Sequence, residues 1–341
     1  MDSLKEVFDV ARSKAVNCHC CPRCDGKACR GETPGVGGKG NGDSFVRNVE
    51  KLHEIKLVYD TIATNDAIDT STTFFNHRVS LPVFAAPISG IEQNYGAKMS
   101  DGQYTELLVE GCNLAGTIAF SGDGMQQAMF KDPLTHIKNN HGIGVPTIKP
   151  WLSEEFEWRA QLSKEAAVIA VACDIDASGL SNLRHSKTPV GFKDVTALKQ
   201  LKSMVDCPLI IKGVLSVDGA LKALDAGCDA IVVSNHGGRV LDECVSGIEM
   251  LEAIVEAVQG KMKIYVDGGF RSGFDVFKAL AMGADGVLIG RPISLALIGD
   301  GAKGLQCYFA QIKSELEDAM AMCGCKTIKE IKRKSVKVDF K

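Results

Sequence analysis

The chain has 341 residues, of which 45% are hydrophobic, and its formal net charge is −3 at neutral pH. This length and composition provide enough apolar material for one large core or two modest ones. The sequence has no long basic run that would bind nucleic acid or an anionic membrane. No apolar run approaches the roughly 20 residues of a membrane helix, and the polar, charged N-terminus is unlike a signal peptide. We therefore expect a cytoplasmic protein with a small-molecule ligand.

The first 45 residues differ in composition from the rest of the chain. A helix-like start is followed by five cysteines and then by the run GVGGKGNGDSF, whose glycines argue against regular structure. The cysteines are Cys18, Cys20, Cys21, Cys24 and Cys29. They are close enough for several thiolates to bind one zinc ion or iron–sulfur cluster, although their spacing matches no standard ligand set. Redox-active thiols and an unliganded loop are the other interpretations. We treat 1–45 as an N-terminal helix with a Cys/Gly-rich segment, and 46–341 as a second domain.

Short apolar runs alternate with longer amphipathic segments along the second domain. The eight runs are LPVFAAP (81–87), TIAFS (117–121), VPTIKP (145–150), VIAVACD (168–174), LIIKG (209–213), AIVVSN (230–235), KIYVDGG (263–269) and GVLIGRP (286–292). Several are rich in the β-branched residues that suit strands buried on both faces. Helical patterns lie between them, and two of these end at a glycine typical of a helix C-terminus. This alternation predicts an α/β protein with a (β/α)8 TIM barrel. An open Rossmann sheet is the alternative, but no G-x-G-x-x-G follows its first strand.

Ionisable side chains end, or directly follow, most of these runs. They are Lys149, Asp174, Lys212, His236, Asp267, Arg271 and Arg291. A barrel brings the C-terminal ends of its strands together around one site. Because a charge there is costly unless it is paired or used, the repetition predicts a functional site at that end.

The run SNHGGRVLD (234–242) is the most informative motif. It places an imidazole and a guanidinium directly after a strand, beside glycines that let the backbone approach a ligand closely. This pair suits proton abstraction and carboxylate binding. A lone histidine in a tight turn is more often a structural residue, but the complete nine-residue string favours a functional interpretation.

This string resembles the signature of the FMN-dependent 2-hydroxy-acid dehydrogenases and oxidases. The resemblance continues through IIKG (210–213), VDGGFRSGFDVFKALAMGADGVLIGRP (266–292) and SELEDAMAMCGC (314–325), and more weakly through LPVFAAPISG (81–90). Together these segments extend over most of 45–335. The resemblance implies an FMN enzyme that oxidises a 2-hydroxy acid to a 2-oxo acid and passes the electrons to an acceptor. It also implies a homo-oligomer, a tetramer or larger.

The resemblance further implies roles for individual residues. His236 would be the catalytic base, and Arg239 would bind the substrate carboxylate as a bidentate fork. Asp174 would pair with the histidine, and Lys212 would stabilise the reduced flavin near N1/O2. From the residues alone, a helix cap for Asp174 and an interior ion pair for Lys212 remain open. Besides Lys212 and His236, the cofactor-binding residues would be Pro87, Ile88, Ser89, Ser121, Ser234, Gly237, Asp267, Gly269, Arg271, Gly290 and Arg291, with the two arginines at the phosphate.

The sequence departs from the family pattern in its substrate-binding residues. Lys149 stands where the family has a tyrosine, and 1–57 contain no tyrosine to fill a second such position. A second substrate-binding arginine is also missing, and only Arg184 in the short loop after the fourth strand is available to replace it. We count Lys149 as substrate-binding, where it favours a more acidic substrate; the alternative is that it contacts the flavin or a neighbouring carboxylate. Two alternative functions stay open: an FMN-dependent, non-redox isomerase of the type 2 isopentenyl-diphosphate kind, and a catalytically altered flavin or metal sensor.

Overall fold

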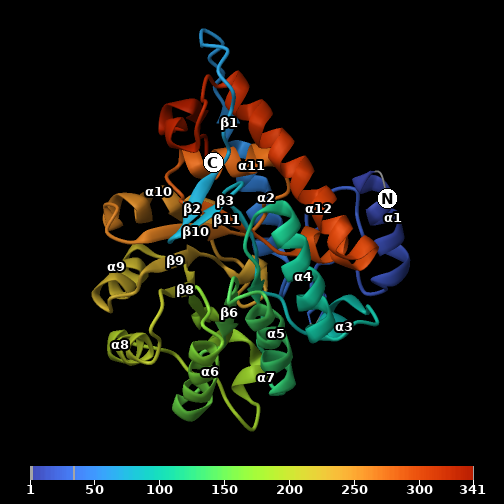
Figure 1. The fold of residues 1–341 in the computed structure, drawn as a ribbon, viewed down its shortest axis with the longest axis vertical. Coiled ribbons are helices and arrows are strands. Elements are labelled where there is room, and N and C mark those ends of the chain that lie inside the picture. The colour runs from blue at the N-terminus through green and yellow to red at the C-terminus, as the bar shows by residue number, and fades with distance from the viewer. Residues whose placement is uncertain (1–2, 34, 341) are drawn as a thin grey trace.

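Eight parallel strands form the centre of the molecule (Figure 1). The computed structural model describes residues 3–33 and 35–340. The barrel strands are β4 (Val83–Ala85), β5 (Phe120–Ser121), β6 (Val145–Ile148), β7 (Val171–Asp174), β8 (Leu209–Val214), β9 (Ala230–Val233), β10 (Lys263–Asp267) and β11 (Gly286–Ile289). They pair in the order β4-β11-β10-β9-β8-β7-β6-β5, and a parallel bridge between Ala85 and Ala119 links the two outer strands. The predicted (β/α)8 barrel is confirmed, with one strand from each apolar run, and the Rossmann alternative is wrong.

Helices cover the outside of the barrel and connect its strands (Figure 1). They are α3 (Ile91–Tyr95), α4 (Asp101–Ala115), α5 (Ala128–Asn139), α6 (Ser153–Glu165), α7 (Ser181–Arg184), α8 (Val195–Ser203), α9 (Val217–Asp225), α10 (Gly247–Val258), α11 (Gly273–Ala281) and α12 (Arg291–Met322). The hydroxyls of Ser216 and Ser272 cap α9 and α11 by accepting a backbone N–H of the first turn. Gly227 and Gly283 follow these two helices with φ of 76° and 99°, the left-handed region that favours glycine.

The N-terminal segment lies against both the helical layer and the mouth of the barrel. Helix α1 (Leu4–Lys14) packs on α12 (Figure 1). A Cβ at Gly299 would lie 2.3 Å from the carbonyl oxygen of Val7, so the glycine permits this close approach. We call residues 15–42 the strap; its described residues form no helix or strand, as its composition predicts. The strap leads into α2 (Asp43–Glu54), which spans the predicted boundary at residue 45. The Lys39 N–H donates to the carbonyl of Gly238, which holds the strap against the barrel.

Aromatic and aliphatic side chains together fill the barrel interior. A hairpin of β2 (Thr72–Phe74) and β3 (His77–Val79) runs into β4 and inserts Phe74 into this layer. The Phe74 ring centroid lies 4.8 Å from that of Phe84 and 5.6 Å from that of Tyr265. Because the eight strands are parallel, their C-terminal ends and the polar residues there lie together at one end of the barrel. The remaining short elements are β1 (Lys56–Leu57) paired with β12 (Val336–Lys337), and η1 (Ile175–Gly179), η2 (His236–Gly238), η3 (Ile328–Glu330) and η4 (Arg333–Ser335).

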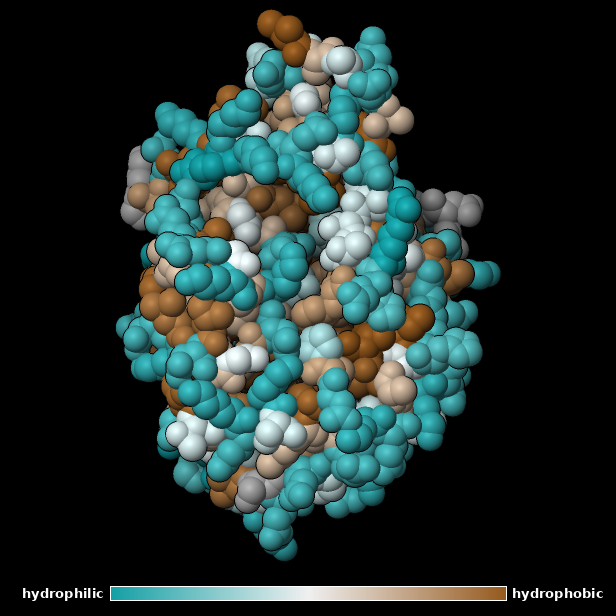
Figure 2. Space-filling model, turned by 60° about the vertical axis from the view of Figure 1, so that its left-hand side comes forward, coloured by the Kyte–Doolittle hydropathy of each residue, from teal (hydrophilic) through white to brown (hydrophobic). Residues whose placement is uncertain are grey.

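Hydrophilic side chains cover most of the face shown in Figure 2, and the hydrophobic ones occur there in separate patches. The segment between β1 and β2 projects away from the barrel (Figure 1, top) and includes Ile62, which is 96% exposed. Among the described residues, no helix combines the length and the apolar character needed to cross a membrane.

Candidate active site

A cavity of about 540 Å³ lies at the C-terminal ends of the barrel strands. This volume is in the range of about 300–1,000 Å³ that is usual for small-molecule sites. Strap residues, including Val36 and Lys39, form part of its wall. The predicted site residues that line the cavity are Pro87, Ile88, Ser89, Lys149, Asp174, Lys212, His236, Gly237, Arg239, Asp267, Gly269, Arg271, Gly290 and Arg291. The predicted convergence of strand ends is therefore observed.

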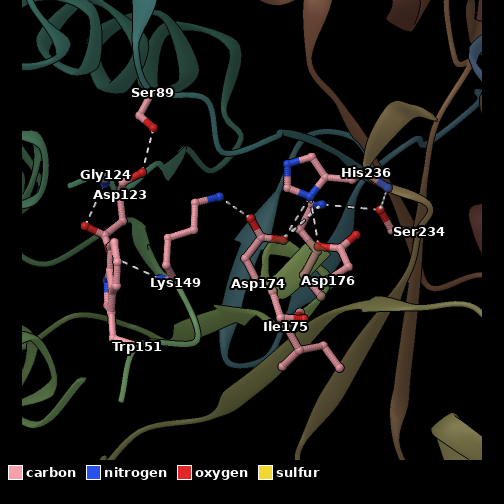
Figure 3. A network of polar contacts seen from close by, with 12 residues as sticks. Ser89, Asp123, Gly124, Lys149, Trp151, Asp174, Ile175, Asp176, Ser234 and His236 are labelled. Carbon is pink, nitrogen blue, oxygen red and sulfur yellow. Dashed lines mark hydrogen bonds and ion pairs between the residues drawn. The ribbon is translucent and has the colours of Figure 1, made fainter. Parts of the chain in front are cut away.

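His236 presents one ring nitrogen to two carboxylates (Figure 3). Its Nδ1 lies 2.8 Å from Oδ1 of Asp176 and 3.4 Å from Oδ1 of Asp174. An ionised carboxylate can only accept a hydrogen bond, so Nδ1 carries the proton of the neutral ring and Nε2 is left as an acceptor. Burial disfavours the charged ring, but the charges of Asp174 and Asp176 outweigh it and raise the pKa of His236. Asp176 was not predicted as a site residue, because it lies beyond the strand end.

Lys212 is a buried ammonium between two aspartates. Its Nζ lies 3.4 Å from Asp267 and 3.5 Å from Asp174. Burial opposes the charge, but these carboxylates overcome that cost and raise the pKa of Lys212. The interior ion pair that the sequence left open is therefore present, and the ammonium still lines the cavity. It is a fixed positive charge at the centre of the site.

Lys149 also pairs with Asp174, its Nζ lying 2.6 Å from Oδ2 (Figure 3). Of the interpretations of this lysine, contact with a neighbouring carboxylate is the one that the geometry favours. Asp123, a second residue that sequence reasoning missed, holds the segment in place. It accepts hydrogen bonds from the Lys149 N–H at 3.1 Å, from Trp151 Nε1 at 2.5 Å and from Arg159 Nε at 3.1 Å. The position of Lys149 is thus set by a buried network.

Three arginines at the cavity donate to neutral oxygens. Arg239 donates to the carbonyls of Gly35 and Gly37 and to the side-chain oxygen of Asn94. Arg291 donates to the carbonyls of Val36, Gly37 and Gly237. Arg271 donates to the carbonyls of Cys24 and Phe270. No acidic side chain among the described residues lies within ion-pair distance of these guanidiniums. Burial and the charge of Arg291 lower the pKa of Arg239 to about 10. Because buried cations are rarely left without a counter-charge, these arginines indicate binding sites for anions.

The predicted phosphate site is lined by exposed backbone. Gly268 and Gly269 follow β10 with φ of 92° and 88°, and a Cβ at Gly269 would lie 2.2 Å from a backbone oxygen of α2. A Cβ at Gly237 would lie 2.7 Å from Nη1 of Arg291. Bare peptide groups beside guanidiniums that have no acidic partner suit a phosphate dianion. The donor set therefore fits the phosphate of FMN.

Three other sequence-predicted residues do not line the cavity. Ser234 lies behind it, where its hydroxyl accepts from the His236 N–H at 3.0 Å and contacts Lys212 Nζ at 3.3 Å. Ser121 is buried, and its hydroxyl has no hydrogen-bond partner among the described residues. Arg184 is exposed at the end of α7, where it packs on Phe192 away from the cavity wall.

The five strap cysteines also lie outside the cavity wall. The Cys20 N–H contacts Cys18 Sγ at 3.4 Å, and Arg271 Nη2 contacts Cys24 Sγ at 3.5 Å. Within 3–33 and 35–340, no three of these sulfurs lie close enough together to share a metal ion. The predicted metal site therefore stays a prediction. Among the described residues, the only group of three metal-ligating side chains close enough to share an ion is His236 with Asp174 and Asp176. The positive charges of the adjacent Lys149 and Lys212 disfavour a cation at this position.

Comparisons with known proteins place this geometry in context. A family model described as FMN-dependent dehydrogenase matches residues 36–123 and 153–338. The 4-hydroxymandelate oxidase of Amycolatopsis orientalis is 29% identical over 331 residues, which are 89% of this chain and 92% of that protein. A peroxisomal (S)-2-hydroxyacid oxidase of Arabidopsis thaliana is 46% identical over 148 residues, 43% of this chain and 40% of the relative. A crystal structure of mandelate oxidase with benzoyl-formic acid superposes with a TM-score of 0.80 at 27% identity, over 100% of this chain and 99% of that one.

The barrel, the glycine-rich strand ends and the lysine and histidine at its mouth, together with the family match, define a flavoenzyme of the (β/α)8 class. The family match covers most of the chain and omits 124–152, the segment that contains Lys149. The chain belongs to the family of FMN-dependent dehydrogenases, which confirms the resemblance, and it is an FMN-dependent oxidoreductase.

Proposed function

We propose that this enzyme oxidises a 2-hydroxy acid to the corresponding 2-oxo acid, with His236 as base and Arg239 as carboxylate anchor. The observation that carries the proposal is that both groups line one cavity, and that Arg239 has no acidic partner among the described residues. Because Nδ1 of His236 is directed at the carboxylates, Nε2 is available to accept the substrate hydroxyl proton. A guanidinium fork binds two carboxylate oxygens at once, which fixes the substrate carbon relative to the base.

The residues that would hold FMN follow from the same geometry. Arg271 and Arg291 would bind the phosphate together with bare backbone at Gly237, Gly269 and Gly290. Bound FMN supplies the acceptor for the two electrons and the hydrogen that leave C2 of the substrate. Lys212 would place a positive charge where the ring becomes negative on reduction. Pro87, Ile88, Ser89 and Asp267 would complete the cofactor wall, and Ser121 and Ser234 would support it from behind.

We further propose a monocarboxylate as substrate, lactate-like or larger. Lys149 adds no free positive charge to the site, since Asp174 lies 2.6 Å from its ammonium. With Arg271 and Arg291 assigned to the phosphate, Arg239 is the remaining guanidinium that the described residues contribute to the cavity wall. The names of the relatives, 4-hydroxymandelate oxidase and 2-hydroxyacid oxidase, support a substrate with one carboxylate beside its hydroxyl.

The test is anaerobic reduction of the holoenzyme. Flavin absorbance is followed after mixing with lactate, 2-hydroxybutanoate and mandelate, with propionate, butanoate and phenylacetate as controls that lack only the hydroxyl. We expect bleaching with at least one hydroxy acid and with none of the controls. Malate, which carries a second carboxylate, should reduce the flavin more slowly than the best monocarboxylate.

His236→Asn provides the matched variant for this assay. It should bind the 2-oxo acid product but reduce the flavin at least about a hundredfold more slowly, since general-base catalysis contributes about 10²–10⁴-fold. A holoenzyme that no 2-hydroxy acid bleaches would refute the proposal. Conversion of a diphosphate substrate without net flavin reduction would instead support the isomerase alternative. If the cellular role of the protein is unchanged in the His236→Asn variant, the result would support the alternative of a catalytically altered flavin or metal sensor.

Two further proposals concern the strap and the assembly. A zinc ion or an iron–sulfur cluster at Cys18, Cys20, Cys21, Cys24 and Cys29 is tested by metal and sulfide analysis of protein purified without oxygen; less than one equivalent of zinc or iron would reject it. A homo-oligomer, tetrameric or larger, is tested by light scattering of the holoenzyme, and a monomer at micromolar concentration would reject it.

A further inference from the structure

Two carboxylates, two positions apart in the sequence, flank the same imidazole nitrogen. Asp174 is the last residue of β7, and Asp176 lies in the following turn, η1. Figure 3 shows both side chains directed at the lower nitrogen of His236. The distance from Nδ1 to Asp176 is 2.8 Å and meets hydrogen-bond criteria, whereas the distance to Asp174 is 3.4 Å. The shorter contact with His236 is therefore made by Asp176, in the turn after β7, and not by Asp174 at the end of that strand.

The two carboxylates differ in their other partners. Asp174 accepts the ammonium of Lys149 at 2.6 Å and lies 3.5 Å from that of Lys212. Asp176 forms no ion pair with a lysine or arginine of the described residues, and its Oδ2 is buried without a hydrogen-bond partner there. The charge of Asp174 is therefore shared among two lysines and the imidazole, whereas among the described residues His236 is the one basic group within ion-pair distance of Asp176.

The backbone of β8 provides the space for Asp176. Gly213 has φ of 94°, and a Cβ at this position would lie 2.3 Å from Cγ of Asp176 and 2.7 Å from its Oδ1. The pairing of β8 with β9 also shifts register between Lys212 and Val214. Such an irregularity in a strand next to an active site redirects side chains. The fold thus accommodates the Asp176 carboxylate beneath the imidazole at a position where only glycine fits.

We propose that Asp176 is the positioning residue of His236, holding Nδ1–H and stabilising the imidazolium, while Asp174 serves as counter-ion to Lys149 and Lys212. The role in catalysis rests on the proposed function. In that reaction the substrate hydroxyl proton moves to Nε2, and the positive charge formed on the ring is compensated through the existing Nδ1–H bond. No proton is transferred to Asp176.

The charged groups around His236 are consistent with this assignment. Asp174 faces it from β7, Asp176 from η1 and Lys212 from β8. Burial and the charge of Lys212 oppose protonation of the ring, but the charges of Asp174 and Asp176 outweigh them and raise the pKa of His236. Burial and the neighbouring charge of Asp174 raise the pKa of Asp176, and His236 opposes this rise. The Asp176 carboxylate is therefore destabilised when the ring is neutral and stabilised when the ring gains a proton. This is the change in charge that the base undergoes when it accepts the proton.

The experiment compares Asp176→Asn with Asp174→Asn in the FMN-loaded protein, using two readouts. The first is nitrogen-15 NMR of labelled histidine, with the His236 signals assigned through His236→Asn. We expect the neutral wild-type ring to carry its proton on Nδ1. Asp174→Asn should keep this tautomer. Asp176→Asn should shift a large part of the population to Nε2–H, because an amide can also donate to Nδ1.

The second readout is the rate constant of flavin reduction at saturating 2-hydroxy acid. Asp176→Asn should lower it by about 10²–10⁴-fold, as expected when a base loses its orienting carboxylate, and should lower it more than Asp174→Asn does. Gly213→Ala should reproduce both effects without changing a charged group, since its Cβ displaces the Asp176 carboxylate. FMN content and the unfolding midpoint show which variants remain folded.

Two outcomes separate this inference from the proposed function. If Asp174→Asn loses the Nδ1–H tautomer and Asp176→Asn keeps it, the assignment to Asp176 is overturned, whatever the enzyme oxidises. If the wild-type tautomer depends on Asp176 but no 2-hydroxy acid reduces the flavin, the pairing stands and the proposed function fails.

Discussion

Replacement of Arg239 should weaken carboxylate binding selectively. In the structure its guanidinium donates to neutral groups, among them Oδ1 of Asn94 at 3.0 Å and the carbonyl of Gly37 at 3.3 Å. A substrate carboxylate would exchange two such contacts for two charge-assisted ones. Taking about 1 kcal/mol for each neutral and about 2.5 kcal/mol for each charge-assisted hydrogen bond, the gain is about 3 kcal/mol. This corresponds to roughly a hundredfold in the dissociation constant.

The assay is a titration of the flavin spectrum with a 2-oxo acid and with the corresponding 2-oxo amide. Arg239→Met should weaken binding of the acid by about a hundredfold, whereas binding of the uncharged amide should change little. Arg239→Lys keeps the charge but loses the planar fork, so we expect an intermediate loss of about tenfold. Equal losses for acid and amide, or no loss for either, would refute the assignment of Arg239 as carboxylate anchor.

Three further predictions follow from buried groups. Arg159→Met should lower the free energy of unfolding by about 3–5 kcal/mol in urea titrations, because it leaves the buried carboxylate of Asp123 without its ion-pair partner. The raised pKa of His236 should make flavin reduction slow as the pH falls through that value, because the base must be neutral, and stopped-flow rates across pH test this. The same pKa shift affects stability with the opposite sign. The contribution of His236 to the free energy of unfolding is complete below the pKa that the residue has in the unfolded chain, and it disappears as the pH rises through the raised pKa of the folded protein. Gly269→Ala should weaken FMN binding at least about tenfold in fluorescence titrations, since φ of 88° costs a residue with Cβ about 1–3 kcal/mol and the Cβ meets Asn48.

The barrel and most of its site were predictable from sequence for a simple physical reason. Strands buried on both faces appear as short apolar runs, and the residue at the end of each run must face the mouth of the barrel. Lys212, His236 and Arg291 are found in this way, because each ends or follows such a run and lines the cavity. The same rule identifies Asp174 at the end of β7, but it cannot say which partner that carboxylate takes.

The roles of Asp176 and Asp123 could not be predicted from the sequence in this way. The contact of Asp176 with His236 depends on the turn η1 and on the space at Gly213, and neither leaves a periodic signal in the sequence. Asp123 lies in the loop after β5, and its role as a shared acceptor requires Trp151 and Arg159 to converge on it from the next segment. The run SGDG (121–124) places this aspartate between two glycines, a pattern that is typical of a turn.

The charges at the cavity divide into two groups with different consequences. The lysines have carboxylates, Asp174 for Lys149 and both Asp174 and Asp267 for Lys212, so they set the local field without requiring a ligand anion. Among the described residues, the arginines donate to carbonyl and amide oxygens, many of them from the strap, and Arg271 also contacts the sulfur of Cys24. The neutral oxygens satisfy the donors without compensating the charge. A carboxylate or phosphate therefore gains most at the arginines. Since the strap supplies the oxygens that such an anion would replace, the strap belongs to the binding site as much as the barrel does.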